Sequence, residues 1–414
     1  MQSNRRQMIF KELNMKATTM LICALGLACS AFAKNADVKP EGEGTPESPY
    51  QFVQMENFVW LAHQRDKIDA GTTVYCVQTD DIDATETEEW QSFPEIETNN
   101  INGENKGSWA LNYDGQGFSI ENLCIGQTVG FYSALFALGS FQLKNINIKG
   151  VKSKAPSGST GILVGGMGAG YIDNCHIKGT CVRATAGLIQ EVGVPQGSRV
   201  EISNCSVETD LTNAWAGVIE LVRNYGTLVI KNTSYKGKIT VGDDYGGDVV
   251  SAGFIKALQL EEKHAKVIIE DCYSAAEIKC ANSLLGISGF LGMINNANYG
   301  EVVDIEISRC YATGSISNTR PWGSASFLTA VYGCEPVVKD CYYNSTTLKK
   351  ADKYALPKTE EEMKQLATFE NWDFENVWDI DEGESMPYLI SELPEPCGLF
   401  ALLLLPLLLR RNRN

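Results

Sequence analysis

The chain has 414 residues, and 44% of them are hydrophobic, which is typical of a globular protein. Its formal net charge is −16, from 51 acidic and 35 basic residues. Because nucleic acids and anionic membranes attract basic surfaces, this balance argues against either as a partner.

The N-terminus carries the features of a secretory signal peptide. An apolar segment at 20–28 precedes Ala31 and Ala33, which have the small-x-small spacing of a signal peptidase cleavage site. Translation starts either at residue 1, with a longer basic leader, or at Met15. Cys29 leaves a lipoprotein signal as an alternative. We therefore expect export and cleavage by signal peptidase.

A short pattern recurs along the middle of the chain. Each copy is an apolar run that ends on a polar residue and then, in most copies, a Cys, as in YIDNC at 171–175. The polar residues are Asn122, Asn145, Asn174, Asn204, Asn232, Asp271, Arg309 and Asp340. The position after them holds Leu123, Ile146, Cys175, Cys205, Thr233, Cys272, Cys310 and Cys341. The mean interval of about 31 residues indicates a repeat architecture.

A second pattern lies between these copies. A small residue precedes two apolar residues, as in Gly187-Leu188-Ile189. Each repeat thus offers two short β-prone runs separated by turn residues, and few segments have helical periodicity. The sequence predicts an all-β fold of stacked strand-turn-strand coils.

The Asn column resolves a conflict in the alternation of side chains. In the run from Val200 to Asn204, a period of two directs Asn204 inward and Cys205 outward, contrary to residue type. A left-handed backbone conformation, which Asn tolerates, would reset the alternation and turn Cys205 inward. In coils stacked at about 4.8 Å, successive Asn side chains would then hydrogen-bond along the axis, and the Cys would form an interior row.

These repeats resemble the GLUG-motif repeats of bacterial surface proteins. The resemblance is carried by TGILVGGMGAGYIDNCHIKG at 160–179 and SGFLGMINNANYGEVVDIEISRCYATGSI at 288–316. It extends over about 42–390, since both flanks are similar to segments that open and close such arrays. The resemblance implies a right-handed parallel β-helix, a solenoid with roughly 31 residues per coil.

The chain is expected to have five parts. They are a signal region 1–33, an N-terminal lead-in and cap 34–115, the repeat array 116–347, a C-terminal cap 348–390 and a tail 391–414. A helix at 55–67 would cover the strand edges of the first coil, and the aromatic residues Trp372, Phe374 and Trp378 would cover those of the last.

The tail has three features in sequence. Pro394, Glu395 and Pro396 precede an apolar run at 397–409, and the terminal basic cluster consists of Arg410, Arg411 and Arg413. This arrangement resembles the bacterial PEP-CTERM sorting signal. The resemblance implies processing by an exosortase-like enzyme, with the Arg cluster on the cytoplasmic side. Thirteen apolar residues are short compared with the roughly 20 that span a bilayer, which favours a transient membrane segment over a fixed tail anchor.

The Cys column has three interpretations. The side chains are small apolar core residues, or they form disulfides between adjacent coils, such as Cys175 with Cys205 or Cys310 with Cys341. An oxidising compartment would permit such disulfides. Metal binding is the third interpretation, but the His residues that usually accompany Cys at such sites are missing.

No catalytic residue and no cofactor is predicted. None of the three His belongs to a metal-binding or catalytic motif; they are His63, His176 and His264. Asp243, Asp244 and Asp248 lie in the longest insertion between two repeats, where they either bind Ca²⁺ or form a solvated acidic turn.

The expected function is that of a secreted, non-catalytic protein with an adhesive or structural role at the cell surface or in the extracellular matrix. Surface glycans or exopolysaccharide are its candidate ligands. Polysaccharide lyases and glycoside hydrolases also use β-helices, so a carbohydrate-active enzyme is the alternative. Its candidate residues, by analogy of fold alone, are Glu220, Arg223, Asp243 and Asp244.

Overall fold

The computed structural model describes ten stretches of the chain. They are 37–90, 93–98, 108–126, 132–154, 160–241, 250–260, 265–280, 286–297, 303–318 and 323–393. The predicted signal peptide and sorting tail, with the residues named for them, lie outside these stretches.

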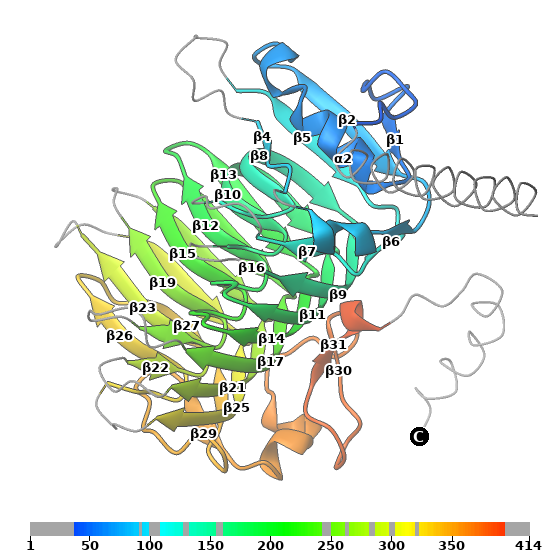
Figure 1. Cartoon of the computed structure of the whole chain (residues 1–414). Helices are drawn as coiled ribbons and strands as arrows, with labels where there is room; N and C mark the ends of the chain where they lie inside the picture. Colours follow the sequence, from blue (N-terminus) through cyan, green and yellow to red (C-terminus); the bar gives the residue numbers. More distant parts are fainter. Residues whose placement is uncertain are drawn as a thin grey trace, which may run out of the picture.

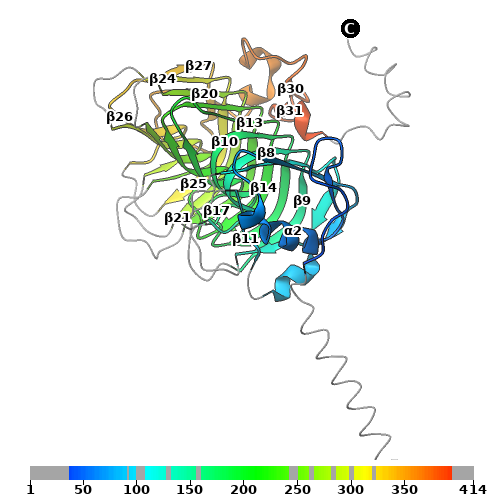
Figure 2. The same cartoon turned by 90° about the horizontal axis from the view of Figure 1, so that it is seen from above.

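Parallel strands are stacked into a solenoid, which confirms the predicted all-β repeat architecture (Figure 1). Each coil returns the chain to the same ladder one rung later, as parallel neighbours require a crossover connection. Among the described strands, every pairing is parallel except that of β30 with β31, two strands near the C-terminus. Figure 2, from above, shows the rungs lying one over another.

A 16-stranded sheet forms two faces of the solenoid. On the first face lie β12 (Ile189–Val194), β15 (Ile219–Asn224), β19 (Ile255–Leu260), β23 (Leu291–Asn296) and β26 (Leu328–Tyr332). On the second lie β13 (Arg199–Ser203), β16 (Thr227–Lys231), β20 (Lys266–Glu270), β24 (Asp304–Ser308) and β27 (Val337–Lys339). Two long strands pair with both faces, β8 (Phe136–Lys144) and β10 (Val164–Asp173) in the earlier rungs.

An 11-stranded sheet forms the third face, which follows the Asn column. Its strands are β3 (Ile82–Asp83), β6 (Ser119–Glu121), β7 (Cys124–Ile125), β9 (Asn147–Ser153), β11 (His176–Val182), β14 (Ser206–Thr212), β17 (Ser234–Val241), β21 (Tyr273–Cys280), β25 (Tyr311–Asn318), β28 (Tyr342–Asn344) and β29 (Leu356–Lys358). A narrow ladder at one corner contains β18 (Ser251–Ala252) and β22 (Ile287–Ser288).

The core consists of identical or similar side chains stacked from rung to rung. Phe254, Phe290 and Phe327 come from the small-apolar-apolar pattern and are fully buried. Their rings stack nearly parallel, with centroids 4.6 and 4.7 Å apart. In-register stacking of this kind follows from the repeat, because equivalent residues occupy equivalent positions on every rung.

At the N-terminal end, parallel strand pairing begins before residue 116. Parallel pairing starts at β1 (Tyr50–Phe52), β2 (Thr73–Gln78) and β5 (Ala110–Asp114), so the solenoid extends N-terminally beyond the predicted boundary at residue 116. A short strand, β4 (Ile96–Glu97), pairs with β8, and η2 (Thr85–Glu89) contacts β7.

The helix of the N-terminal end is α2 (Met55–Ala62), and η1 (Arg65–Lys67) follows it. The helix thus ends five residues before the predicted boundary, since a turn separates these two elements. Phe58 of α2 packs against Phe52 and Tyr113 at ring distances of 4.8 and 5.6 Å. The helix therefore buries the first strands of the solenoid, as a cap does.

The expected aromatic cap at the C-terminal end is wrong in its placement. The segment 359–393, here called the strap, includes η3 (Glu362–Lys364), η4 (Leu366–Thr368), β30 (Trp378–Asp379), β31 (Tyr388–Leu389) and η5 (Ile390–Glu392). It lies along the side of the solenoid, against the 11-stranded sheet (Figure 1). The reason is that Trp378 meets the stacked rings of Tyr273 and Tyr311 on the outer face of β21 and β25.

The last rung is closed by other means. β27, β28 and β29 have three residues each, against eight in β21 and β25. Pro357 lies within β29 and offers no N–H to a further strand. On the first face, the Asp352 carboxylate accepts hydrogen bonds from the backbone N–H groups of Phe327 and Leu328, at 2.6 and 2.9 Å. One rung earlier, the N–H of Leu291 donates to the carbonyl of Phe327 on the following rung. Leu328 has no following rung in its ladder, and the Asp352 carboxylate takes the place of that carbonyl.

Candidate functional site

The turn between the second and third faces has the same backbone conformation on seven consecutive rungs. Its residues all have positive φ, between 46° and 55°, and they are Asn145, Asn174, Asn204, Asn232, Asp271, Arg309 and Asp340. The register of the flanking strands aligns them in one file. We call this file the turn column. Asn suits it because Asn adopts the left-handed region at lower cost than most residues.

Asn122 does not belong to the turn column, although the sequence placed it there. It has a φ of 61°, but the register of β6 with β9 aligns it with Gly150, which also has positive φ. The residue aligned with Asn145 on that rung is Gly115, because Asp114 pairs with Lys144. The irregular spacing of the first rungs produced this error: Asn122 begins a different turn.

The amides of the turn column donate hydrogen bonds toward the preceding rung. Asn174 Nδ2 donates to Asn145 Oδ1 at 2.9 Å, and Asn232 Nδ2 donates to Asn204 Oδ1 at 3.0 Å. Asn204 instead donates to Asp173 Oδ1 at 2.8 Å. Asn174 Oδ1 is engaged by the His176 ring, whose Nε2 lies 3.0 Å away. The ladder therefore consists of linked pairs rather than one continuous chain.

The Cys file lies inside the solenoid, directly after the turn column. Cys175, Cys205, Cys272, Cys310 and Cys341 are all buried free thiols. Burial raises the pKa of the Cys175, Cys310 and Cys341 thiols well above the ordinary value. Such thiols stay protonated and are poor nucleophiles and metal ligands.

These thiols share a hydrogen-bonding role that the sequence did not reveal. Each lies within hydrogen-bonding distance of the carbonyl oxygen two residues earlier, for example 3.0 Å from Cys205 Sγ to Ser203 O and 3.1 Å from Cys272 Sγ to Glu270 O. Thr233 takes the same place in the file, and its hydroxyl donates to the Lys231 carbonyl at 2.8 Å. Small size combined with a side-chain donor is what Cys and Thr have in common.

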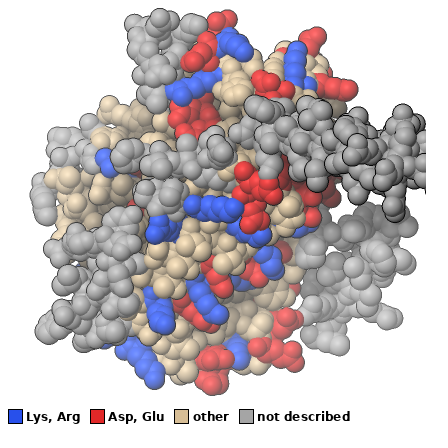
Figure 3. Space-filling view, viewed as in Figure 1, with Lys and Arg blue, Asp and Glu red and all other residues tan. Residues whose placement is uncertain are grey.

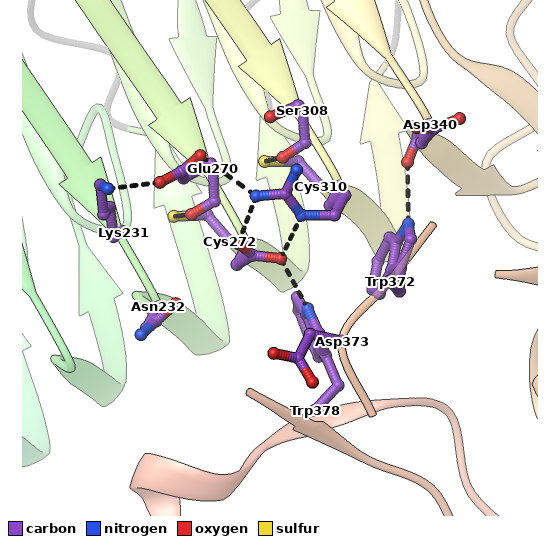
Figure 4. A network of polar contacts seen from close by, with 12 residues as sticks. Lys231, Asn232, Glu270, Cys272, Ser308, Cys310, Asp340, Trp372, Asp373 and Trp378 are labelled. Carbon is purple, nitrogen blue, oxygen red and sulfur yellow. Dashed lines mark hydrogen bonds and ion pairs between the residues drawn. The ribbon is translucent and has the colours of Figure 1, made fainter. Parts of the chain in front are cut away.

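Two later members of the turn column, Asp271 and Arg309, form a charged network with neighbouring residues (Figure 4). Arg309 makes a bidentate contact with the Asp271 carboxylate, at 2.8 and 2.7 Å, and also reaches Glu270 at 3.1 Å. Lys231 pairs with Glu270 at 2.5 Å. Trp378 of the strap donates its indole N–H to Asp271 Oδ1 at 2.9 Å. The network thus joins three rungs and the strap.

Charge compensation sets the ionisation of this network. Burial opposes ionisation of Glu270, but the hydrogen bonds and charges of Lys231 and Arg309 outweigh it and hold the Glu270 pKa below its ordinary value. The hydrogen bonds from Arg309 to Asp271 raise the pKa of the guanidinium further. Glu270 and Arg309 are therefore both charged at neutral pH, and their ion pair links two rungs.

The strap makes further polar contacts as it runs from the last rung toward the middle of the solenoid. Trp372 donates its indole N–H to the Asp340 carbonyl at 3.1 Å, and the Tyr311 hydroxyl donates to the Pro387 carbonyl at 2.6 Å. Near its end, Glu392 accepts the Tyr273 hydroxyl at 2.7 Å and pairs with Lys236 at 2.6 Å. The strap is fixed along its whole length, up to two residues before Pro394.

Two of the candidate enzyme residues, Glu220 and Arg223, lie in the described part of the chain, and each forms an ion pair. Glu220 pairs with Lys256 on the next rung at 3.0 Å, and Arg223 pairs with Glu191 on the preceding rung at 3.2 Å. The other candidates, together with Asp248, lie outside the described residues. Among the residues that the structure describes, no three His, Cys, Asp or Glu side chains gather as a metal-ion site.

The outer face of the 11-stranded sheet carries charges of both signs in alternation (Figure 3). Neighbouring rungs are joined by ion pairs such as Lys178 with Glu208 at 2.9 Å and Lys149 with Glu121 at 3.5 Å. Exposed pairs of this kind contribute about 0–1 kcal/mol each to stability. In the described part of the chain, no helix is long and apolar enough to cross a membrane.

The stacked ladders define the class of the protein, an all-β solenoid of parallel strands. No family model matches the chain, and no curated protein sequence matches it. A similar solved structure is that of a candidate immunoglobulin A1 protease from Bacteroides ovatus. The similarity covers 84% of this chain and 94% of that chain, with 16% sequence identity and a TM-score of 0.45. At these values it carries no argument about the present chain.

Proposed function

We propose that this protein is a secreted, non-catalytic right-handed parallel β-helix of the GLUG-repeat type. In this proposal, signal peptidase removes the leader and an exosortase-like enzyme processes the tail. The solenoid then serves as an adhesive or structural element at the cell surface or in the extracellular matrix.

The observation that carries the proposal is the fixation of the strap. Glu392 is held by Lys236 and Tyr273 on the side of the solenoid, and the predicted sorting signal begins two residues later. Because Glu392 is bound to the solenoid, the predicted tail leaves the folded domain at a defined place. This arrangement is consistent with a protein that is retained through its C-terminus. The ion pairs between rungs support the same role, since they serve cohesion of the stack.

Cell fractionation tests this proposal. We expect the intact protein in the envelope or matrix fraction and a variant lacking residues 394–414 in the medium. The double variant Pro394→Ala, Pro396→Ala should behave like the truncation, whereas Glu382→Ala, an exposed position in the strap, should behave like the intact protein. An unchanged distribution of the truncated chain would refute retention through the tail.

A further inference from the structure

One outward-facing file of the first face consists of a glycine and of residues whose side chains can form hydrogen bonds. The register of β12, β15, β19, β23 and β26 aligns Gly193, Arg223, Gln259, Asn295 and Tyr332. We call this file the amide stripe. Its members point outward because their neighbours along each strand point into the core; for example, the buried Leu258 and Leu260 flank Gln259.

A largely apolar file runs beside the amide stripe. The same register aligns Leu221, Ala257, Met293 and Ala330, which we call the apolar stripe. At its N-terminal end, Glu191 aligns with Leu221. Ala257 is buried, whereas Leu221, Met293 and Ala330 are partly exposed. Hydrogen-bonding groups of the amide stripe border these apolar side chains along the solenoid axis.

The two amides of the stripe, those of Gln259 and Asn295, are partly exposed. Within the described part of the chain, the side-chain amides of Gln259 and Asn295 have no hydrogen-bonding partner. Tyr332 is 50% exposed. This state differs from that of the 11-stranded sheet, where Lys178 and Glu208 on adjacent rungs satisfy each other.

The glycine end of the stripe has open space above its backbone. A Cβ added at Gly193 would meet nothing within 4 Å, and one added at Gly168, on the preceding rung, would meet only the Gly193 carbonyl at 3.5 Å and Pro195 at 3.9 Å. Neither glycine has a positive φ, so the backbone does not demand glycine here. Because Gly168 and Gly193 have no side chains, the backbone of the sheet beside Arg223 is not covered by side chains at these two positions.

We propose that the amide stripe and the apolar stripe bind a neutral, extended polysaccharide that lies parallel to the solenoid axis. Side-chain amides both donate to and accept from sugar hydroxyls, and apolar and aromatic side chains accommodate the C–H faces of sugar rings. The rung spacing of about 4.8 Å is on the scale of one sugar residue, so neighbouring sugars would meet side chains of neighbouring rungs.

The ligand is neutral because the surface offers no spare positive charge. Glu191 compensates Arg223, and the formal net charge of −16 repels polyanions. The proposed ligand rests on the proposed function, because it names the class of molecule that a surface-exposed solenoid would bind. Saccharide binding is measured on the purified chain and retention is measured by cell fractionation. A negative result in one experiment therefore does not change the result of the other.

The test is isothermal titration of the purified full-length chain with cellohexaose, mannohexaose and xylohexaose as neutral probes and hexagalacturonate as an acidic probe. We expect at least one neutral hexasaccharide to bind and hexagalacturonate not to bind. The double variant Gln259→Ala, Asn295→Ala should weaken binding about tenfold or more, since each amide loses its hydrogen bonds. Tyr332→Ala should weaken it severalfold.

Two controls make the result decisive. Lys178→Ala, on the 11-stranded sheet, should leave the affinity unchanged, and circular dichroism should show that the stripe variants keep the wild-type fold, because their side chains face outward. The proposal is overturned if no neutral hexasaccharide binds, or if the double variant binds as tightly as the wild type. Release of shorter saccharides during the titration would also overturn it, since that would indicate an enzyme.

Discussion

The two halves of the turn column meet the same backbone requirement with different side chains. From Asn145 to Asn232 the column is neutral, and its amides bond mainly to each other and to the neighbouring Asp173 and Asp114. From Asp271 to Asp340 it is charged, although the φ values stay near 50°. The charged half is the one beneath the strap, where Trp378 and Trp372 supply additional donors.

The difference shows what selects residues at a left-handed turn of a solenoid. Where a rung has only other rungs as partners, Asn fits because one side chain tolerates positive φ and both donates and accepts. Where another segment crosses the turn, the identity of the residue follows the partner. Arg309 adopts a φ of 50° because its guanidinium is held by Asp271 and Glu270.

Of the four substitutions, removal of the Trp378 side chain should lower the free energy of unfolding most. Trp378 is fully buried, and its ring lies 4.5 Å from that of Trp372. We expect Trp378→Ala to lower the free energy of unfolding by about 3–5 kcal/mol, through lost packing and the loss of one of the two hydrogen bonds to Asp271 Oδ1. Urea denaturation measures this. Leu366→Ala, at a strap position 43% exposed, is the matched control and should cost little; a loss below about 1 kcal/mol for Trp378→Ala would contradict a fixed strap.

Substitution in the neutral half should separate backbone strain from hydrogen bonding. Asn204 has a φ of 54° and takes part in two amide hydrogen bonds, with Asn232 and Asp173. Asn204→Ala should cost about 2–3 kcal/mol, because Ala loses both bonds and disfavours positive φ. Asn204→Gly should cost about 1 kcal/mol less than the Ala variant, since glycine removes the strain alone. Equal unfolding free energies for the two variants would show that the left-handed turn is unimportant.

The charged half should respond to acid. The Glu270 pKa lies below the ordinary value of 4.5, so its ion pairs stabilise the folded state fully above about pH 5. That stabilisation is lost as the pH falls through the lowered folded-state pKa. We expect Glu270→Gln to be less stable than wild type by about 1 kcal/mol at pH 7, with the gap closing at acidic pH. Thermal unfolding across pH 3–7 measures the gap, and the exposed Glu277→Gln should show none; a gap independent of pH would contradict the assignment.

Substitutions in the Cys file should change the free energy of unfolding least. If a side-chain donor is what the position requires, Cys272→Ser should cost less than about 1 kcal/mol, because the hydroxyl can still reach the Glu270 carbonyl. Cys272→Ala, which lacks a donor, should cost more than the Ser variant. Chemical denaturation under reducing conditions compares the two. The reverse order would indicate that the file is purely apolar.

Much of the array could be predicted because its signals are local and repeated. The residues after Asn174 and Asn204 recur in register, so their column and the stacking of coils follow from the spacing. The inward Cys followed from the left-handed conformation expected of Asn, and the parallel β-helix was implied by the resemblance to GLUG repeats. The helix in the lead-in was also visible, although its end was placed too late, since a turn interrupts the apolar pattern after Ala62.

Features that depend on distant partners left no local signal. The contact between Trp378 and Asp271 joins residues 107 positions apart, and nothing in the strap sequence distinguishes the side of a solenoid from its end. The role of Asp352 at the last rung is similar, since it depends on which N–H groups remain unpaired there. Asn122 was misassigned because the first coils are irregular, so counting residues does not give the register.

Disulfide trapping between adjacent rungs tests the central claim, the in-register stacking of coils, most directly. Lys178 aligns with Glu208, and Glu208 aligns with Lys236 one rung further. In-register parallel neighbours lie about 4.8 Å apart, within reach of a disulfide, and residues two rungs apart lie about 10 Å apart, beyond it. The pair Lys178→Cys, Glu208→Cys should therefore cross-link under mild oxidation, and the pair Lys178→Cys, Lys236→Cys should not. Cross-linking of the second pair but not the first would contradict the stacking.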